Sequence, residues 1–509
     1  MDGLKSVLRF SPFAPNARRA ARSGSYAAHM FIAALLFAVN LYGPLQPGPY
    51  AAGFKVLERY DYARPYLSAG RKGERARPMQ VSIWYPAEAK SGAPMLFGDY
   101  VALVAQGEDA VFNLPGINDV KQRAEWKASK TWARRDAKPA AGKFPLIVWS
   151  LHWPALSHAT PEYLASHGYV VVTMPRVDST PGAGDRAATD LWTKALDNQF
   201  LINEAAKFPP ADVHNIGVTG FSAGGHWALG EAMRNPDVHA VVSLDSIMLY
   251  HEAVGQAFAA MPFYGLDRVR VPVLHMIRSV WVPNEDPALW AGMRYADRTY
   301  YEFTDPVLDH FDFQSVGYEA TLFGARPQAA AASAKAFAIF NRATLGFFDA
   351  HLKGGAPFDP ASPDAQFVKA THLAALPAKP TTTQFLETMT LDGVDAAMQF
   401  YRDVAPLPEL TLNTAGYVLL LAQRRPADAA KLFALNVEAY PQSANARDSY
   451  ADALEAAGET ARAIAESQKA LELLDADPTL SADRKAAVKK NIEDKLARLT
   501  ARAASPAPR

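Results

Sequence analysis

Between residues 144 and 352 the chain alternates short apolar runs with longer segments whose apolar positions recur at helical spacing. Apolar runs of about four to eight residues bounded by turn residues are typical of strands buried on both faces. The runs are 146–149, 170–174, 216–219, 240–244, 273–277 and 299–303, and the expected helices are 161–166, 187–207, 223–234 and 331–352. Strands that alternate with helices predict βαβ units and a mostly parallel sheet covered on both faces.

Upstream of this region the pattern is less regular. Residues 43–79 are rich in proline, glycine and arginine and predict an extended lead-in, whereas Val81–Tyr85 alternates like a strand. Residues 94–140 break the rhythm with polar segments of helical character, the longer one at 119–135. This helical insertion could cap a site or decorate the surface, and the sequence leaves both readings open. Residues 48–355 are expected to form one α/β domain.

Downstream, the composition changes twice. Residues 356–383 are rich in proline, alanine and threonine and predict a linker. The region 384–501 is helical in pattern, beginning with a helix at 384–403, and contains a repeat in which Ala429 and Ala463 are 34 positions apart. That period, with small residues where helices cross, predicts a tetratricopeptide-like domain. Such helices are a candidate surface for a protein partner or for self-association.

The N-terminus carries a targeting pattern. Residues 1–26 hold five basic residues against one acid, and 30–39 is an uninterrupted apolar run. A basic region followed by an apolar run shorter than about 20 residues is typical of a signal peptide. Residues 1–42 are therefore expected to be a signal peptide or an uncleaved anchor. The protein would be exported, periplasmic or membrane-tethered, and would meet a membrane only through this segment.

Composition narrows the function classes. Hydrophobic residues make up 49% and charged residues 20% of the 509 positions, as in a well-packed globular protein of two or three domains. The formal net charge is zero, so no overall field recruits nucleic acid. Cysteine is absent, which excludes disulfides, thiolate nucleophiles and cysteine-ligated metals.

The candidate nucleophile lies between a predicted strand and a predicted helix. Residues 220–224 read Gly-Phe-Ser-Ala-Gly, a G-x-S-x-G sequence centred on Ser222. A serine lifted on a sharp strand-to-helix turn needs small neighbours, which the two glycines provide. The helix that follows would direct its N-terminal N–H groups, including that of Ala223, toward an oxyanion formed at the serine.

A serine hydroxyl needs a base to take its proton and an acid to orient that base. In an α/β sheet of this kind the partners follow in the order serine, acid, histidine, after the carboxyl ends of strands. Asp245 ends one predicted strand, and His310 follows another. Glu285 and Asp286 follow the strand between them and remain alternatives for the acid.

Several segments together resemble the platelet-activating-factor acetylhydrolase branch, near the dienelactone hydrolases, of the α/β-hydrolase superfamily. They are the G-x-S-x-G sequence, Val-Ser-Leu-Asp at 242–245, the later loop histidine, and the segments 48–54, 83–86, 144–150, 164–172 and 347–354. The resemblance covers roughly residues 48–355. It implies an α/β-hydrolase fold and a serine hydrolase of carboxylic esters that uses Ser222, Asp245 and His310.

The resemblance also concerns the loop after the first central strand. In the family this loop usually reads Ser-His-Gly-aliphatic, whereas residues 150–153 here read Ser-Leu-His-Trp. The corresponding oxyanion donors would be the backbone N–H groups of Trp153 and Ala223. Bulky residues in the loop would narrow the acyl pocket. The candidate pocket residues are Leu151, His152 and Phe221.

The sequence therefore predicts a serine-dependent hydrolase of small-molecule carboxylic esters with short or compact acyl groups. It would work through an acyl-enzyme and without a cofactor. No His/Glu cluster has metal-ligand spacing, so no metal is expected. A thioesterase or peptidase with the same triad is an alternative. So is an inactive hydrolase-like protein that interacts through its C-terminal helices.

Overall fold

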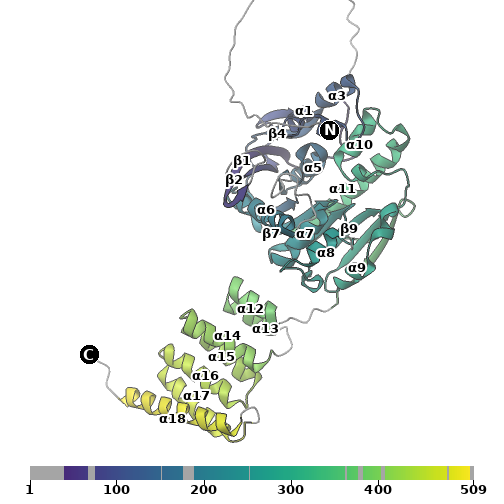
Figure 1. Cartoon of the computed structure of the whole chain (residues 1–509). Helices are drawn as coiled ribbons and strands as arrows, with labels where there is room; N and C mark the ends of the chain where they lie inside the picture. The colour runs from purple at the N-terminus through teal and green to yellow at the C-terminus, as the bar shows by residue number, and fades with distance from the viewer. Residues whose placement is uncertain are drawn as a thin grey trace, which may run out of the picture.

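The chain forms a domain built on a sheet and a C-terminal helical domain in a computed structural model (Figure 1). The described residues are 39–66, 75–150, 152–175, 188–250, 253–361, 364–376, 382–402, 407–477 and 481–504. Most of the predicted signal or anchor, and Leu151, lie outside them. Within these ranges, no helix is both long and apolar enough to span a bilayer.

One mixed sheet organises the first domain. In the described part it has eleven strands in the order β11-β10-β9-β8-β7-β5-β6-β2-β1-β4-β3. The run from β10 to β6 is parallel, and antiparallel β11 and β2 flank it. The strands are β1 Ala51–Tyr66, β2 Arg75–Ala87, β3 Ala93–Leu96, β4 Lys130–Arg135, β5 Phe144–Trp149, β6 Val170–Thr173, β7 Ala211–Phe221, β8 Val238–Leu244, β9 Val273–Arg278, β10 Arg298–Phe303 and β11 Val368–Leu373.

Helices cover both faces of the sheet, because side chains of successive strand residues point to opposite sides. In β5, Leu146 and Val148 enter one hydrophobic core, and Ile147 and Trp149 enter the other. The first core includes α6 Ala188–Ala206, α7 Gly224–Arg234 and α8 Ala253–Ala259. The second includes α4 Pro154–Ser157, α5 Ala159–Ser166, α10 Ser315–Leu322 and α11 Ala330–Leu352.

The strand order places the site. From β5 the chain goes to β6 on one side, and then returns to β7 on the other side of β5. Loops that leave β5 and β7 in opposite directions open a crevice at the carboxyl ends of the strands. The segment after β5 and the turn after β7, which holds Ser222, therefore border the same crevice. This order and the flanking helices define an α/β-hydrolase fold, so the predicted fold class is confirmed.

The N-terminal side differs from the prediction. The expected extended lead-in contains β1 and the start of β2, and β1 pairs antiparallel with β2 along most of its length. The boundary at residue 42 also needs correction, since Leu41 is 0% and Tyr42 is 2% exposed within the core of the domain. Apolar side chains immediately after the N-terminal segment thus belong to the folded domain.

The insertion 94–140 is only partly helical. Its helices are short: α1 Phe97–Val101, α2 Asp109–Phe112 and α3 Val120–Lys127. The helix expected over 119–135 ends at Lys127, and β4 follows. Pairing explains the change, because β4 lies parallel to β1 and antiparallel to β3, so the insertion extends the sheet.

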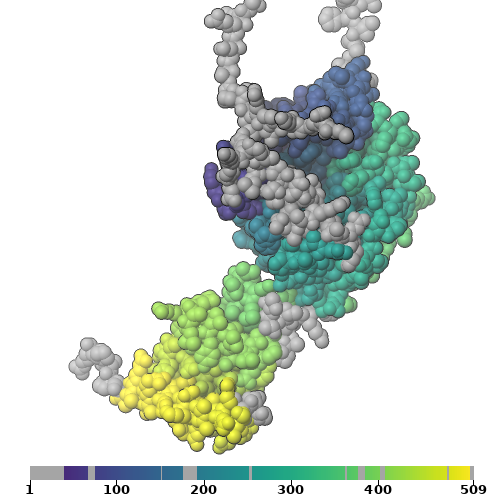
Figure 2. Space-filling view, in the orientation of Figure 1, coloured from purple at the N-terminus to yellow at the C-terminus, as the bar shows by residue number. Residues whose placement is uncertain are grey.

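The predicted linker 356–383 contains β11, which pairs antiparallel with β10 and so belongs to the first domain. The helix expected at 384–403 is two helices, separated where Gly393 adopts a φ of +96° that L residues rarely adopt. The helical region forms its own core, and Figure 2 shows it in green to yellow. Its helices are α12 Thr382–Leu391, α13 Val394–Arg402, α14 Glu409–Tyr417, α15 Pro426–Ala439, α16 Ala444–Ala456, α17 Thr460–Leu474 and α18 Ala482–Ala504, with a π-turn at Val418–Ala422.

Helices α14 to α17 lie in the region with the 34-residue spacing, and its tetratricopeptide-like character stays a prediction. Consecutive helices among them pack on one another. Ala429 on α15 and Ala463 on α17 are both 0% exposed, as expected of small residues where helices cross. Whether these helices bind a partner stays a prediction.

Candidate functional site

Ser222 sits on a sharp turn between β7 and α7. Its φ is +55°, in the left-handed region that costs a non-glycine residue free energy. The turn is tight, because a Cβ added to Gly220 would lie 2.1 Å from the carbonyl oxygen of Gly224. The strained serine lies at the N-terminus of α7, whose first N–H groups have no partners inside the helix. This is the elbow that the sequence predicts.

Asp245 follows β8 and faces His310. Its backbone has a φ of +39°, and its N–H donates to the carbonyl of Met276 at 2.7 Å. The side chain is buried, and Oδ2 lies 2.6 Å from Nδ1 of His310. The loops at the carboxyl ends of the strands therefore bring together an acid and a histidine that lie 65 positions apart in the chain.

His310 is held on a structured loop. It begins the short 3-10 helix η3 His310–Phe313, and the preceding Asp309 caps this helix by accepting from the N–H of Phe311. The imidazole ring lies 4.3 Å, centroid to centroid, from the ring of Phe221, the residue before Ser222. Its side chain remains about a third exposed, at 32%, so solvent and small molecules can reach it.

The alternative acids have other partners. Glu285 accepts from Nε2 of His275 at 2.7 Å and from the hydroxyl of Tyr300 at 2.5 Å. Asp286 caps α9 Pro287–Gly292 by accepting from the backbone of Ala288. The carboxylate next to His310 is thus that of Asp245.

The loop after β5 is only partly described, since Leu151 lies outside the described residues. Trp153 is half-buried and caps α4 with an extended backbone. The N–H of His152 donates to Oγ1 of Thr173 at 3.1 Å, so that amide is engaged. The ring of His152 stacks on Trp149, with centroids 5.5 Å apart. Burial lowers the pKa of His152 to about 3, which keeps this imidazole neutral.

Sequence reasoning missed two residues that support the site. Arg278, at the end of β9, donates from its backbone N to Oδ1 and from Nε to Oδ2 of Asp245, at 3.1 and 2.8 Å. Asn198 on α6 donates to Oγ of Ser150 at 3.1 Å, just before the candidate oxyanion loop. An arginine that closes a buried apolar strand was the available signal for the first, and the second had none.

A cavity of about 360 Å³ lies beside α7 and α8. It is mostly apolar, and its lining includes His226, Met248 and Phe258 but neither His152 nor Phe221, two of the predicted pocket residues. Among the described residues, no group of three or more His, Asp or Glu side chains is arranged to hold a metal ion.

No protein-family model and no curated protein matches the chain. Among solved structures, it is similar to a ferulic acid esterase from Streptomyces cinnamoneus, with 22% sequence identity and a TM-score of 0.49. The match covers 65% of this chain and 98% of the other.

Proposed function

We propose that the protein is a serine-dependent hydrolase of carboxylic esters, with Ser222 as nucleophile, His310 as base and Asp245 as the orienting acid. The observation that carries the proposal is the 2.6 Å contact between His310 and Asp245. It lies at the carboxyl ends of the strands, where Ser222 occupies its strained turn. A constellation of nucleophile, base and orienting acid is recognised by such geometry rather than by sequence position.

In this scheme His310 keeps Nδ1 toward Asp245, which leaves Nε2 to take the proton of the Ser222 hydroxyl. The serine oxygen attacks the ester carbonyl, and the protonated imidazole then gives its proton to the departing alcohol. Water hydrolyses the acyl-enzyme by the same steps, with His310 again as base. The N–H groups of Ala223 and Trp153 would hold the oxyanion, and one such donor contributes about 3 to 4 kcal/mol to lowering the barrier.

The substrate proposed is a small ester with a short or compact acyl group. The support is the bulk around the nucleophile, because the rings of Phe221, His310 and His152 crowd the same edge of the sheet. Neither metal nor organic cofactor enters the scheme. A thioesterase or peptidase would use the same three residues, so substrate comparison must separate these activities.

The test combines covalent labelling with a substrate panel. A fluorophosphonate probe should label the wild-type protein, and Ser222→Ala should abolish both labelling and hydrolysis. p-Nitrophenyl acetate or butyrate should turn over faster than long-chain esters, acyl thioesters or peptides. Addition of EDTA should leave the rate unchanged. Activity that survives Ser222→Ala, or that disappears with EDTA, would overturn the proposal.

A further inference from the structure

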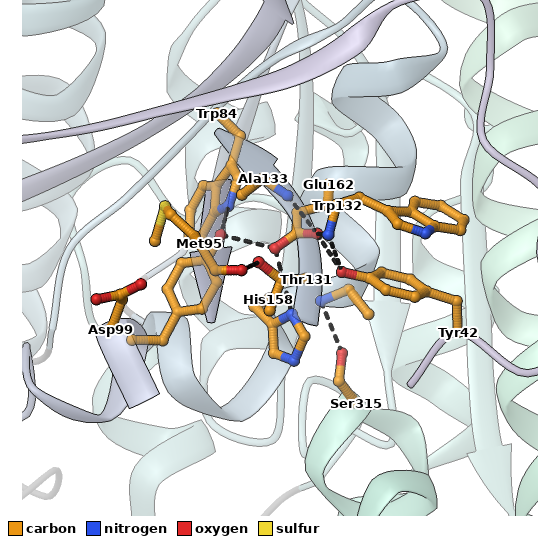
Figure 3. Close-up of polar contacts among 12 residues, drawn as sticks. Tyr42, Trp84, Met95, Asp99, Thr131, Trp132, Ala133, His158, Glu162 and Ser315 are labelled. Carbon is orange, nitrogen blue, oxygen red and sulfur yellow. Dashed lines mark hydrogen bonds and ion pairs between the residues drawn. The ribbon is translucent and has the colours of Figure 1, made fainter. Parts of the chain in front are cut away.

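A buried cluster of ionisable side chains surrounds His158, which directly follows α4 (Figure 3). His158, Glu162 and Glu319 are each 0% exposed. Nδ1 of His158 lies 3.3 Å from Oε1 of Glu162, and Nε2 lies 2.9 Å from Oε1 of Glu319. Both contacts are within ion-pair distance, so the imidazole ring lies between two carboxylate oxygens.

The cluster joins the two segments that leave the candidate site. His158 stands between α4 and α5, shortly after Trp153. Glu319 lies on α10, which begins directly after the loop that carries His310. A neutral contact ties the same two segments, since the N–H of Ala159 donates to Oγ of Ser315 at 3.1 Å.

The surrounding groups favour a charged cluster. Burial alone would lower the pKa of His158, but Glu319 and Glu162 outweigh this effect and raise the pKa to about 10. The imidazolium therefore sits between two carboxylates. Further donors contact both oxygens of Glu162 and Oε2 of Glu319, whereas Oε1 of Glu319 faces His158. They are the hydroxyls of Tyr42 and Tyr100 and the N–H groups of Trp132 and Ala133 for Glu162, and Nε1 of Trp126 for Glu319.

We propose that His158 and Glu319 are positioning residues. They act as a clamp that fixes the segment after β5, residues 152–158, relative to the segment that carries His310, residues 308–317. Separating a buried ion pair leaves an uncompensated charge, so the pair permits one arrangement of the two segments. A displacement of about 1 Å in a catalytic geometry can reduce the rate about 100-fold. His158, Glu162 and Glu319 are fully buried, so we assign them no contact with the substrate. The catalytic consequence rests on the proposed function, whereas the mechanical one does not.

The cluster also ties in the insertion and the start of the domain. Tyr42 precedes β1 and stacks on Trp132, Tyr100 belongs to α1, and Trp132 and Ala133 belong to β4. All of them donate to Glu162, which is on the same helix turn as His158. The insertion therefore contacts the cluster through Glu162 and so helps to hold the segments that flank the site.

Glu319→Gln in the full chain tests the clamp, because glutamine keeps the shape and an acceptor for Trp126 but removes the charge. Glu204→Gln is the matched control. Glu204 is also buried and paired, with Arg59 at 3.0 Å and with Lys207, but it lies near the end of α6 that leads into the start of β7. This end of α6 lies at the amino end of β7, whereas Ser222 lies at its carboxyl end.

The primary measurement is native-state hydrogen exchange of residues 152–158 and 308–317. In Glu319→Gln both segments should exchange at least about tenfold faster, and in Glu204→Gln neither should change. With p-nitrophenyl acetate, kcat should fall about 100-fold in Glu319→Gln with KM within about twofold, and should be retained in Glu204→Gln. Unchanged exchange in Glu319→Gln overturns the clamp.

Two further results keep the outcomes separate. If the wild-type protein hydrolyses no ester and resists the fluorophosphonate probe, the proposed function fails, while hydrogen exchange still decides the clamp. If Glu319→Gln does not fold, Glu319→Asp replaces it, because it keeps the charge of the cluster but withdraws the carboxylate from Nε2 of His158. It should speed exchange in the same two segments several-fold, and unchanged exchange there overturns the proposal equally.

Discussion

Arg278 holds Asp245 at two points. Its backbone N donates to Oδ1 at 3.1 Å, and its guanidinium Nε donates to Oδ2 at 2.8 Å. The second oxygen is also the one that faces His310. Because both carboxylate oxygens are engaged, the Asp245 side chain cannot rotate away from the imidazole without losing several hydrogen bonds at once. The orientation of His310 thus depends on β8 and β9 together.

Replacing the carboxylate should therefore disable the proposed enzyme. Asp245→Asn should lower kcat about 10,000-fold, because the amide no longer selects the correct tautomer and orientation of His310. Circular dichroism should show a folded protein. Glu285→Gln provides the comparison, since Glu285 contacts His275 and Tyr300 instead, and it should leave kcat nearly unchanged. The reverse result would assign the acid to Glu285.

Removing the guanidinium should have a smaller effect of the same kind. Arg278→Met keeps the backbone contact to Oδ1 but frees Oδ2 from one of its two partners. We expect kcat to fall about tenfold to 100-fold with KM little changed, because the lost interaction acts on catalytic geometry rather than on substrate binding. Steady-state kinetics with p-nitrophenyl acetate measure the effect. A rise in KM at constant kcat would show that Arg278 contacts substrate instead.

The sequence predicted the parallel strands well, because most of them contain a short apolar run bounded by turn residues. Val273–Ile277, for example, lies within β9, and the helix expected at 331–352 is α11. It failed for β1 and β4, which mix charged with apolar residues and become strands by pairing with each other and with β2 and β3. At such edges tertiary pairing outweighs local propensity.

The candidate site shows the same division. Ser222 could be found because its turn needs a local pattern of glycines. The contact of Arg278 with Asp245 and the His158–Glu319 pair could not be found, because they depend on which distant segments the fold brings together. Glu162 gathers donors from three separate parts of the chain, and no spacing within one segment encodes that arrangement.

The start of the folded domain can be tested by truncation. Deleting residues 1–38 should leave a stable domain, whereas deleting 1–45 removes the buried side chains of Leu41, Tyr42 and Leu45. Each such side chain contributes about 1.5 to 3 kcal/mol by burial, and the hydroxyl of Tyr42 also donates to Glu162. Urea denaturation should therefore show a loss of several kcal/mol in the longer deletion. Equal stability of the two proteins would place the domain boundary further along the chain.

The other end of the domain gives a matched pair. A chain that ends at residue 376 keeps β11, and one that ends at 366 loses it and leaves β10 as an unpaired edge. The longer protein should be soluble and folded, because the ion pair between Arg268 of the sheet domain and Glu387 of the helical domain is exposed and contributes little. The shorter protein should be less stable and prone to aggregate. Insolubility of the longer one would show that the helical domain completes the core.

Three buried histidines predict how stability depends on pH. Burial lowers the pKa of His152 to about 3 and that of His226 to about 4, below the value of about 6.5 in an unfolded chain. At a pH between the folded and the unfolded pKa, the unfolded state binds more protons than the folded state. The free energy of unfolding should therefore fall as the pH drops from about 6.5 toward 3. For His158 the pKa is raised to about 10, because Glu319 and Glu162 outweigh its burial. Here the folded state binds more protons, so stability is lost as the pH rises from about 6.5 toward 10.

Urea denaturation at several pH values separates these contributions when each variant is compared with the wild type. His226→Leu should flatten the acid side of the profile and leave the alkaline side as it is. His158→Gln should lower stability at neutral pH and flatten the alkaline side of the profile. The reason is that glutamine cannot carry the imidazole proton that Glu319 and Glu162 stabilise in the folded state. An alkaline slope that His158→Gln leaves intact would mean that His158 is neutral in the folded protein, with its charge absent from the cluster.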